Sequence, residues 1–151
     1  MKISVGTDHR GLEQKKMVSQ IASDLGHTVV DHGANSTESC DYPDIAKVLG
    51  HAVSSGETDM GILICGTGIG MSIAANKVKG VRAAVCNTCD QARLSRQHNN
   101  ANVLCIPGDS FEESAVKEMV SLWLATEFEG GRHARRVDKV IAMEGEFGKS
   151  V

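Results

Sequence analysis

Aromatic side chains are scarce in this sequence, with three Phe, one Tyr and one Trp among 151 residues. Few rings are therefore available to stack on nucleotide bases. The net charge is −3, so the chain also lacks the basic surface that nucleic acids require. No apolar run approaches the roughly 18 residues that span a bilayer. We therefore expect neither a nucleic acid nor a membrane as a partner.

A disulfide framework is not expected either. The cysteines form an odd set of five, and no apolar signal segment precedes the strand-like residues 3–6, which predicts a cytoplasmic protein. These cysteines are Cys40, Cys65, Cys86, Cys89 and Cys105. Cys86 and Cys89 have the CxxC spacing of a zinc or redox pair, but no second pair accompanies them, so the spacing alone is a weak indication.

Short apolar runs alternate with amphipathic helical segments along the chain. Strands are expected at 3–6, 27–31, 60–65, 81–86 and 102–106, and helices at 12–25, 42–56, 71–76, 90–97, 111–124 and 133–146. The continuous run 60–65 is typical of a parallel strand covered on both faces. Residues 1–151 are therefore predicted to form a single-domain, doubly wound (Rossmann-like) α/β fold, with a five-stranded parallel sheet, helices on both faces and a C-terminal helix.

A glycine-rich loop follows the run 60–65, at residues 65–70 with the sequence CGTGIG. Ligands of doubly wound sheets bind beyond the carboxyl ends of the strands, which is where this loop falls. Alternating glycines let backbone amides turn inward, and the N-terminus of the next helix adds positive potential. The loop is therefore predicted to hold an anion, either a phosphate or an enediolate that forms during a reaction.

Two nucleotide-binding motifs share glycines with this loop, and neither fits it. The dinucleotide fingerprint has G-x-G-x-x-G spacing in the first β–α turn and an acidic residue about 20 positions later. Here the spacing is G-x-G-x-G in the third unit, and Asn87 stands near the acidic position. The GK[ST] ending of a P-loop is also missing. Cys65 itself has two interpretations, a buried packing residue or a thiolate that acts as base or nucleophile.

Other polar residues fall where they could reach a bound anion. Asp8 and His9 follow the first strand, and Asp8 is expected to cap the next helix. His98 belongs to a polar string that we interpret as a loop. Arg132 and Arg136 are four residues apart, so on a helix they would share one face and could grip one phosphate.

Taken together, these segments resemble the ribose-5-phosphate isomerase B family, which includes the galactose-6-phosphate isomerase subunits. The similar stretches are 6–11, 41–43, 61–70, 72–77, 94–99 and 128–133, in the family's order across nearly the whole chain. The resemblance implies an enzyme that interconverts aldose and ketose phosphates through a cis-enediolate, without metal or cofactor. It also implies a homodimer, or a dimer of dimers, with each site built from both subunits.

The resemblance implies roles for individual residues. Cys65 would be the base that moves a proton between C1 and C2, Thr67 would shuttle protons between the two oxygens, and His98, assisted by Asp8, would open the furanose ring. The substrate-binding residues would be the amides of Gly66, Gly68 and Gly70 as an anion hole, His9, Arg132 and Arg136 as phosphate ligands, and Tyr42 and Asn99 in the sugar pocket.

One branch of the family uses a Glu directly after the glycine loop as its base. That position here is Met71, so the resemblance implies the cysteine mechanism. Ribose 5-phosphate, in exchange with ribulose 5-phosphate, is the expected substrate. Three alternatives stay open: a six-carbon substrate such as allose or galactose 6-phosphate, a noncatalytic nucleotide-binding module, and a zinc or redox protein that uses Cys86 and Cys89.

Overall fold

The computed structural model of the protein describes residues 1–109 and 112–146. Five strands pair in parallel in the order β2-β1-β3-β5-β4. They are β1 (Lys2–Thr7), β2 (Thr28–Asp31), β3 (Met60–Cys65), β4 (Ala83–Val85) and β5 (Val103–Pro107). The order reverses between β1 and β3, so the crevice that binds ligands in such sheets lies beyond the ends of these two strands.

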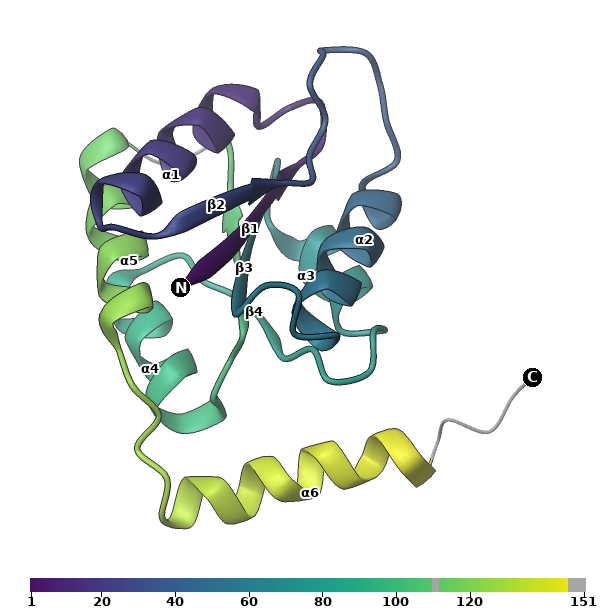
Figure 1. The fold of residues 1–151 in the computed structure, drawn as a ribbon, viewed down its shortest axis with the longest axis vertical. Helices are drawn as coiled ribbons and strands as arrows, with labels where there is room; N and C mark the ends of the chain where they lie inside the picture. The colour runs from purple at the N-terminus through teal and green to yellow at the C-terminus, as the bar shows by residue number, and fades with distance from the viewer. Residues whose placement is uncertain (110–111, 147–151) are drawn as a thin grey trace.

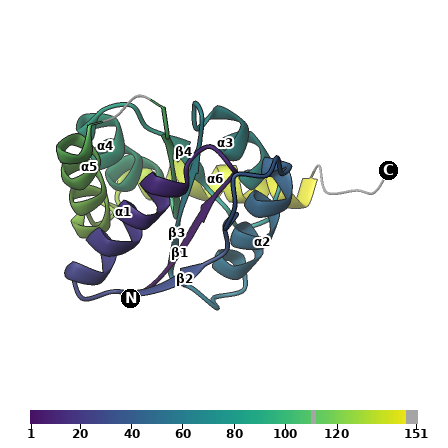
Figure 2. The same cartoon turned by 90° about the horizontal axis from the view of Figure 1, so that it is seen from above.

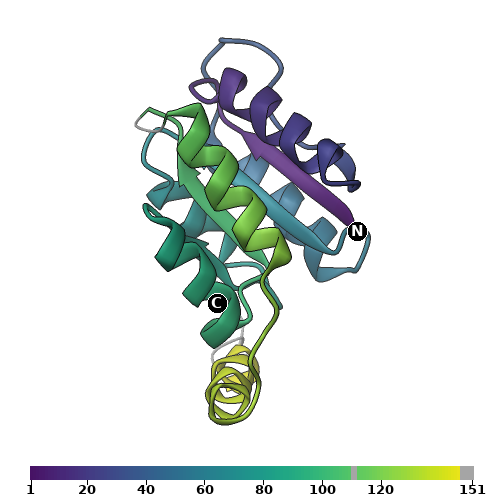
Figure 3. The ribbon, with the colours of Figure 1, turned by 90° about the vertical axis from the view of Figure 1, so that its left-hand side faces the viewer.

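Helices cover both faces of the sheet in the described part of the chain (Figures 1 and 2). The helices α1 (Leu12–Asp24), α4 (Cys89–Asn99) and α5 (Glu113–Ala125) lie on one side, and α2 (Tyr42–Ser54) and α3 (Ile69–Ala75) lie on the other. A last helix, α6 (Arg132–Glu146), runs across one end of the domain (Figure 3). The predicted doubly wound sheet with a C-terminal helix is confirmed. Within the described residues, no helix combines the length and apolar character needed to cross a bilayer.

The central strand β3 is buried along its whole length. Its side chains alternate between the two faces, so Ile62 and Ile64 pack in the core under α1 and α5, whereas Leu63 and Cys65 pack in the core under α2 and α3. Burial on both faces explains why the strand is continuously apolar rather than alternating. As a result, Cys65 ends the central strand on the side covered by α2 and α3.

Most element boundaries differ from those predicted by one or two residues, and only the strand at 60–65 has the predicted bounds. The strand expected at 81–86 contains only Ala83–Val85, and these residues are half-buried because β4 is an edge strand. The helix expected from 111 begins at Glu113, and Phe111 lies outside the described residues.

Two expectations about polar residues were wrong. Asp8 does not cap α1, because the N-cap is Gly11; the Asp8 Oδ1 instead accepts a hydrogen bond from the Arg10 backbone N–H at 2.9 Å. His98 does not lie in a loop, because α4 continues to Asn99 and ends at Asn100 in the left-handed conformation.

A buried ammonium group fixes the start of the loop between β2 and α2. The Lys15 side chain is only 6% exposed. Its Nζ donates to both carboxylate oxygens of Asp31 at 3.0 and 2.8 Å, to the Ala34 carbonyl at 2.8 Å and to Asn35 Oδ1 at 2.8 Å. The Ala34 N–H donates to the Thr7 carbonyl at 2.9 Å, so the same contacts hold the loop against the end of β1.

We expect Lys15→Met to lower the free energy of unfolding by about 1.5–3 kcal/mol, the range for a hydrogen bond to a charged group. The methionine keeps much of the apolar stem but leaves the acceptors of the loop without their donor. Urea denaturation measures the effect. Lys16→Met is the matched control, because Lys16 is 71% exposed and pairs only with Glu13, so its effect should stay within about 0.5 kcal/mol. Equal losses in the two variants would contradict the anchoring role of Lys15.

A candidate active site in two parts

The glycine loop makes a tight turn directly after Cys65. Gly68 has φ +75°, and a Cβ at this position would stand 3.1 Å from the Ile106 carbonyl carbon and from Val85 Cγ2. Both the left-handed backbone and the close approach therefore require glycine. The Cys65 carbonyl accepts a hydrogen bond from the Gly108 N–H at 2.8 Å, which joins the start of the loop to the segment after β5.

Backbone amides of this loop are available to an anion. Gly68 is the N-cap of α3 and offers no side-chain cap, while the Ile69 N–H donates to Thr67 Oγ1 at 3.3 Å. Within the described residues, no group accepts a hydrogen bond from the N–H of Gly70 or Met71. Unpaired N–H groups in the first turn of a helix are the donors that bind anions. The geometry therefore fits the anion hole expected from the sequence.

Three further predicted residues lie at the same end of the sheet. Asp8 is buried at the end of β1, where its N–H donates to the Ile64 carbonyl at 3.4 Å. His9 Nδ1 accepts a hydrogen bond from the Cys40 N–H at 3.4 Å, so its Nε2 carries the proton. The Tyr42 ring lies against the loop, since a Cβ on Gly70 would be 2.9 Å from Tyr42 Cζ. The structure therefore groups these residues with Cys65 and Thr67.

An ion pair beside this group was not foreseen. Arg10 Nη2 donates to Asp109 Oδ2, and a Cβ on Gly66 would be 3.3 Å from both Arg10 Nη1 and Asp109 Oδ2. The pair therefore borders the glycine loop. The two residues are 99 positions apart in the chain, so no local signal in the sequence could have found the contact.

The remaining predicted residues lie at the opposite end of the sheet. His98 and Asn99 end α4, which leads back to the start of β5, and Arg132 and Arg136 belong to α6. Val103 at the start of β5 pairs with Gly61, whereas Pro107 at its end pairs with Cys65. The strand between them spans about 13 Å. A single chain therefore does not bring His98, Asn99 and the two arginines to Cys65.

A cavity of about 750 Å³ lies between the edge of the sheet and α6, next to this second group. Its lining includes Arg82 and Ala84 from the sheet edge, together with His98, Asn99, His133 and Arg136. Arg132 and Arg136 do occupy one helix, as their spacing predicted, and both are exposed. The cavity is large enough for a small anionic ligand, since such sites measure about 300–1,000 Å³.

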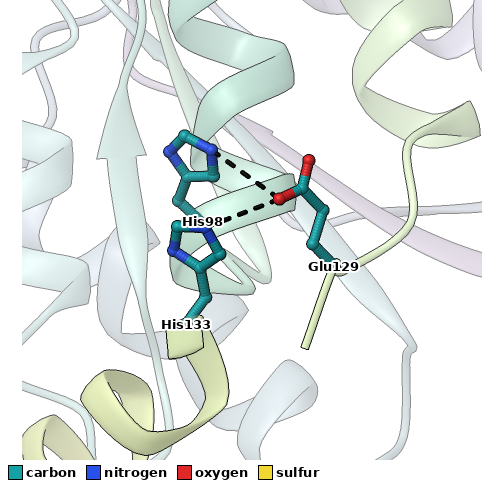
Figure 4. Close-up of side chains that lie close together, drawn as sticks. All are labelled: His98, Glu129 and His133. Atoms are coloured by element: carbon teal, nitrogen blue, oxygen red, sulfur yellow. Dashed lines mark ion pairs between the residues drawn. The ribbon is translucent and has the colours of Figure 1, made fainter. Parts of the chain in front are cut away.

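Two further side chains surround His98 (Figure 4). The His98 and His133 rings are stacked, with centroids 4.1 Å apart and planes 5° apart. Glu129 Oε2 lies 3.5 Å from His133 Nε2 and 4.0 Å from His98 Nε2. Burial lowers the pKa of His133, and the positive charges of His98 and Arg132 lower it further. The sequence indicates no role for Glu129 or His133, although the two residues have i, i+4 spacing.

All five cysteines are free, and the sequence had indicated no disulfide framework. Burial raises the pKa of Cys86 to about 11, partly offset by a hydrogen bond to Ser95. Burial also raises the pKa of Cys105 well above its usual value, with a further contribution from Cys65. These two thiols pack in the core and are poor candidates for chemistry.

Comparisons with known proteins agree with the resemblance seen in the sequence. The model of the ribose/galactose isomerase family matches residues 3–140. Ribose-5-phosphate isomerase B of Escherichia coli is 46% identical over 143 residues, 95% of this chain and 96% of its own length. D-erythrulose-4-phosphate isomerase of Pectobacterium atrosepticum is 40% identical over 141 residues, 93% of each chain. The solved structure of Clostridium thermocellum ribose-5-phosphate isomerase B superposes with a TM-score of 0.95 at 46% identity, covering 97% of this chain and 99% of that one.

Alkylation at pH 8 should separate the core thiols from the others. With a pKa of about 11, only roughly one Cys86 in a thousand is a thiolate at pH 8. We therefore expect iodoacetamide to modify Cys86 at least ~100-fold more slowly in the native protein than after unfolding. Peptide mass spectrometry over time gives both rates, and the half-buried Cys40 serves as the internal comparison. Native modification of Cys86 before Cys40 would contradict this.

Proposed function

The chain belongs to the ribose/galactose isomerase family, and from that premise we propose that it interconverts ribose 5-phosphate and ribulose 5-phosphate. It is an aldose–ketose isomerase of sugar phosphates, as its full-length relatives are. Ribose 5-phosphate is favoured because it is the substrate in the names of relatives that share 46% of their residues with this chain. A noncatalytic nucleotide module and a Cys86–Cys89 zinc or redox protein have no support in the family.

The observation that carries the mechanism is the position of Cys65 beside the unpaired amides of the glycine loop. A proton on the carbon next to a carbonyl is removed by a base that is held close to it. We propose that the Cys65 thiolate takes the proton from C2 of the aldose and returns it to C1. The electron pair left on carbon becomes a cis-enediolate, and the loop amides stabilise its oxyanion.

Neighbouring groups complete the proton transfers in this proposal. The Thr67 hydroxyl is exposed at the loop, where it can carry a proton between the two substrate oxygens. Met71 is fully buried and has no ionisable group, so the position after the loop cannot supply a second base. Tyr42 and the amides of Gly66, Gly68 and Gly70 then form the pocket for the sugar, while Asp8 assists ring opening by His98.

The other end of the domain contributes ring opening and phosphate binding. His98 protonates the ring oxygen of the furanose, Asn99 contacts the sugar, and Arg132 and Arg136 hold the phosphate together with His9. Arginine side chains suit this role because the guanidinium group matches phosphate oxygens in pairs. His98, Asn99 and the two arginines are separated from Cys65 and His9 in one chain, so the proposal requires a second chain.

We propose a homodimer in which each site combines the Cys65 end of one subunit with the His98 end of its partner. Exposed apolar side chains support an interface on these elements: Ile69 and Ile73 on α3 are 54% and 59% exposed, and Val140 and Met143 on α6 are each 51% exposed. A two-fold axis would create two equivalent sites. Whether dimers pair into tetramers, and the cytoplasmic location, stay predictions.

A six-carbon substrate is the second candidate, because the family model also covers galactose isomerases. A relative that acts on erythrulose 4-phosphate shows that chain length varies among similar proteins. Values of kcat/KM for four-, five- and six-carbon phosphates decide between them. Ribose 5-phosphate should give the highest value, and a higher value for allose or galactose 6-phosphate would overturn the ribose assignment while leaving the mechanism in place.

Cys65→Ala should lower kcat by at least ~100-fold, since a positioned general base contributes 10²–10⁴. Transfer of solvent deuterium to the substrate C1/C2 positions should fall in parallel. Cys89→Ala is the control, because it removes a half-buried thiol outside the proposed site and should keep near-normal activity. A near-normal rate in Cys65→Ala would rule out the thiolate as base.

Mixing two inactive variants tests the shared site directly. Cys65→Ala and His98→Ala are each expected to be inactive as homodimers. In a mixed dimer one site carries both substitutions and the other carries neither, so random mixing should restore about a quarter of wild-type activity. The measurement is the isomerase rate after the variants are unfolded and refolded together. Activity no greater than the sum of the separate variants would exclude a site built from two chains.

A further inference from the structure

The side chains of His98, Glu129 and His133 form a compact set of metal-ligating groups. Within residues 1–109 and 112–146, it is the one such set in which all ligand atoms lie within 4.8 Å of one another. Zinc bonds to imidazole nitrogen and carboxylate oxygen are about 2.0–2.2 Å, so two ligands of a tetrahedral ion stand about 3.3–3.6 Å apart. The separation of His133 Nε2 and Glu129 Oε2 is 3.5 Å, and that of His98 Nε2 and Glu129 Oε2 is 4.0 Å.

We propose that this triad binds a divalent transition-metal ion of the zinc type, and that the bound ion inhibits the enzyme by occupying His98. Two imidazoles and one carboxylate would fill three positions of a tetrahedral ion, which leaves the fourth to water. Nitrogen ligands select zinc and its neighbours over Mg²⁺ and Ca²⁺, which prefer oxygen. The binding stands on geometry alone, whereas the inhibition rests on the proposed function of His98.

The position of His133 Nε2, 3.5 Å from Glu129 Oε2, suits a ligand. Arg132 Nε lies 3.5 Å from His133 Nε2 and donates to it, so this nitrogen carries its lone pair, and a bound ion would displace the arginine from it. Glu129 supplies the negative charge that a cation needs beside two arginines. Its side chain is 48% exposed and can follow a small movement of the ion.

The stacking of the His98 and His133 rings means that one ring must rotate before both can bind the same ion. An ion lies close to the plane of each imidazole that binds it, and these two planes are nearly parallel at 5°. One ring therefore has to turn about its χ2 angle. His98 is the freer ring, because its side chain is 38% exposed whereas that of His133 is 8% exposed. The arginines of α6 oppose a cation, so affinity should be lower than at a closed four-ligand site.

Cobalt(II) is the probe for binding, because a tetrahedral Co²⁺ ion absorbs visible light much more strongly than the hydrated ion. We expect this absorption on titration of the wild-type protein. Glu129→Gln and His133→Gln should each weaken binding at least ~10-fold, since even the partners that orient metal ligands contribute 10–100-fold. His51→Gln, an exposed histidine on α2, is the control and should bind like wild type. Glu129 is exposed, so its variant tests the site even if His133→Gln does not fold.

Absence of the absorption in wild type, or its full retention in Glu129→Gln, would overturn the metal site. A thiolate-to-cobalt charge-transfer band would place the ion on a cysteine and would also overturn it.

The isomerase assay tests the inhibitory consequence. Zn²⁺ should inhibit wild type and His51→Gln reversibly, with recovery on addition of a chelator. Each variant is compared with its own metal-free rate, and Glu129→Gln should require at least ~10-fold more Zn²⁺ for half inhibition. Full activity with cobalt bound would show that the ion does not block His98. If the metal-free protein isomerised no sugar phosphate, the proposed function would fail, whereas the cobalt spectra would still decide the metal site.

Discussion

The burial of β3 on both faces is the constraint on which the rest of the structure depends. Ile62 and Ile64 fill one core while Leu63 and Cys65 fill the other. A shift of the strand by one residue would exchange the two sets, so the register is fixed by packing. Packing of the core therefore decides where Cys65 ends the strand and where the glycine loop begins. The hydrophobic effect therefore determines the position of Cys65 and of the glycine loop, and the reactive groups of the site depend on that position.

Parallel topology also explains why the site is in two parts. Every helix between two parallel strands returns the chain to the amino end of the sheet, so residues after a strand and residues after a helix lie at opposite ends. Asp8 and Cys65 follow strands, whereas His98 and Asn99 end a helix. No packing of side chains can close that distance inside one domain. The proposed association of two copies would bring the two groups together, and α3 and α6 offer exposed apolar side chains for it.

The sequence was sufficient for the sheet, for the buried strand β3 and for the position of Asp8 and His9 at the same end of the sheet as Cys65, because apolar runs and strand ends are local signals. The place of Tyr42 near the glycine loop was implied by the family resemblance alone. The sequence did not indicate that His98 lies in a helix, because α4 has no clear apolar stripe near its end. Polar contacts support that helix instead, as in the hydrogen bond from Arg93 to Gln97 at 2.7 Å. The Arg10–Asp109 pair and the packing of His133 and Glu129 on His98 depend on tertiary contacts between distant segments, which no local pattern encodes.

The glycines of the molecule differ in the physical reason that requires glycine at each position. Gly130 and Gly131, in the turn before α6, have φ +67° and +55°, and no described atom lies within 4 Å of a Cβ built on either. The turn thus excludes other residues through backbone torsion alone, at about 1–2 kcal/mol each, whereas Gly68 is excluded by torsion and by contact together. The turn before α6 should therefore tolerate more substitutions than Gly68 does. Random mutagenesis with selection for function should recover asparagine at the turn that positions Arg132 and Arg136, because asparagine tolerates the left-handed region. At Gly68, in the loop that follows Cys65, it should recover only glycine.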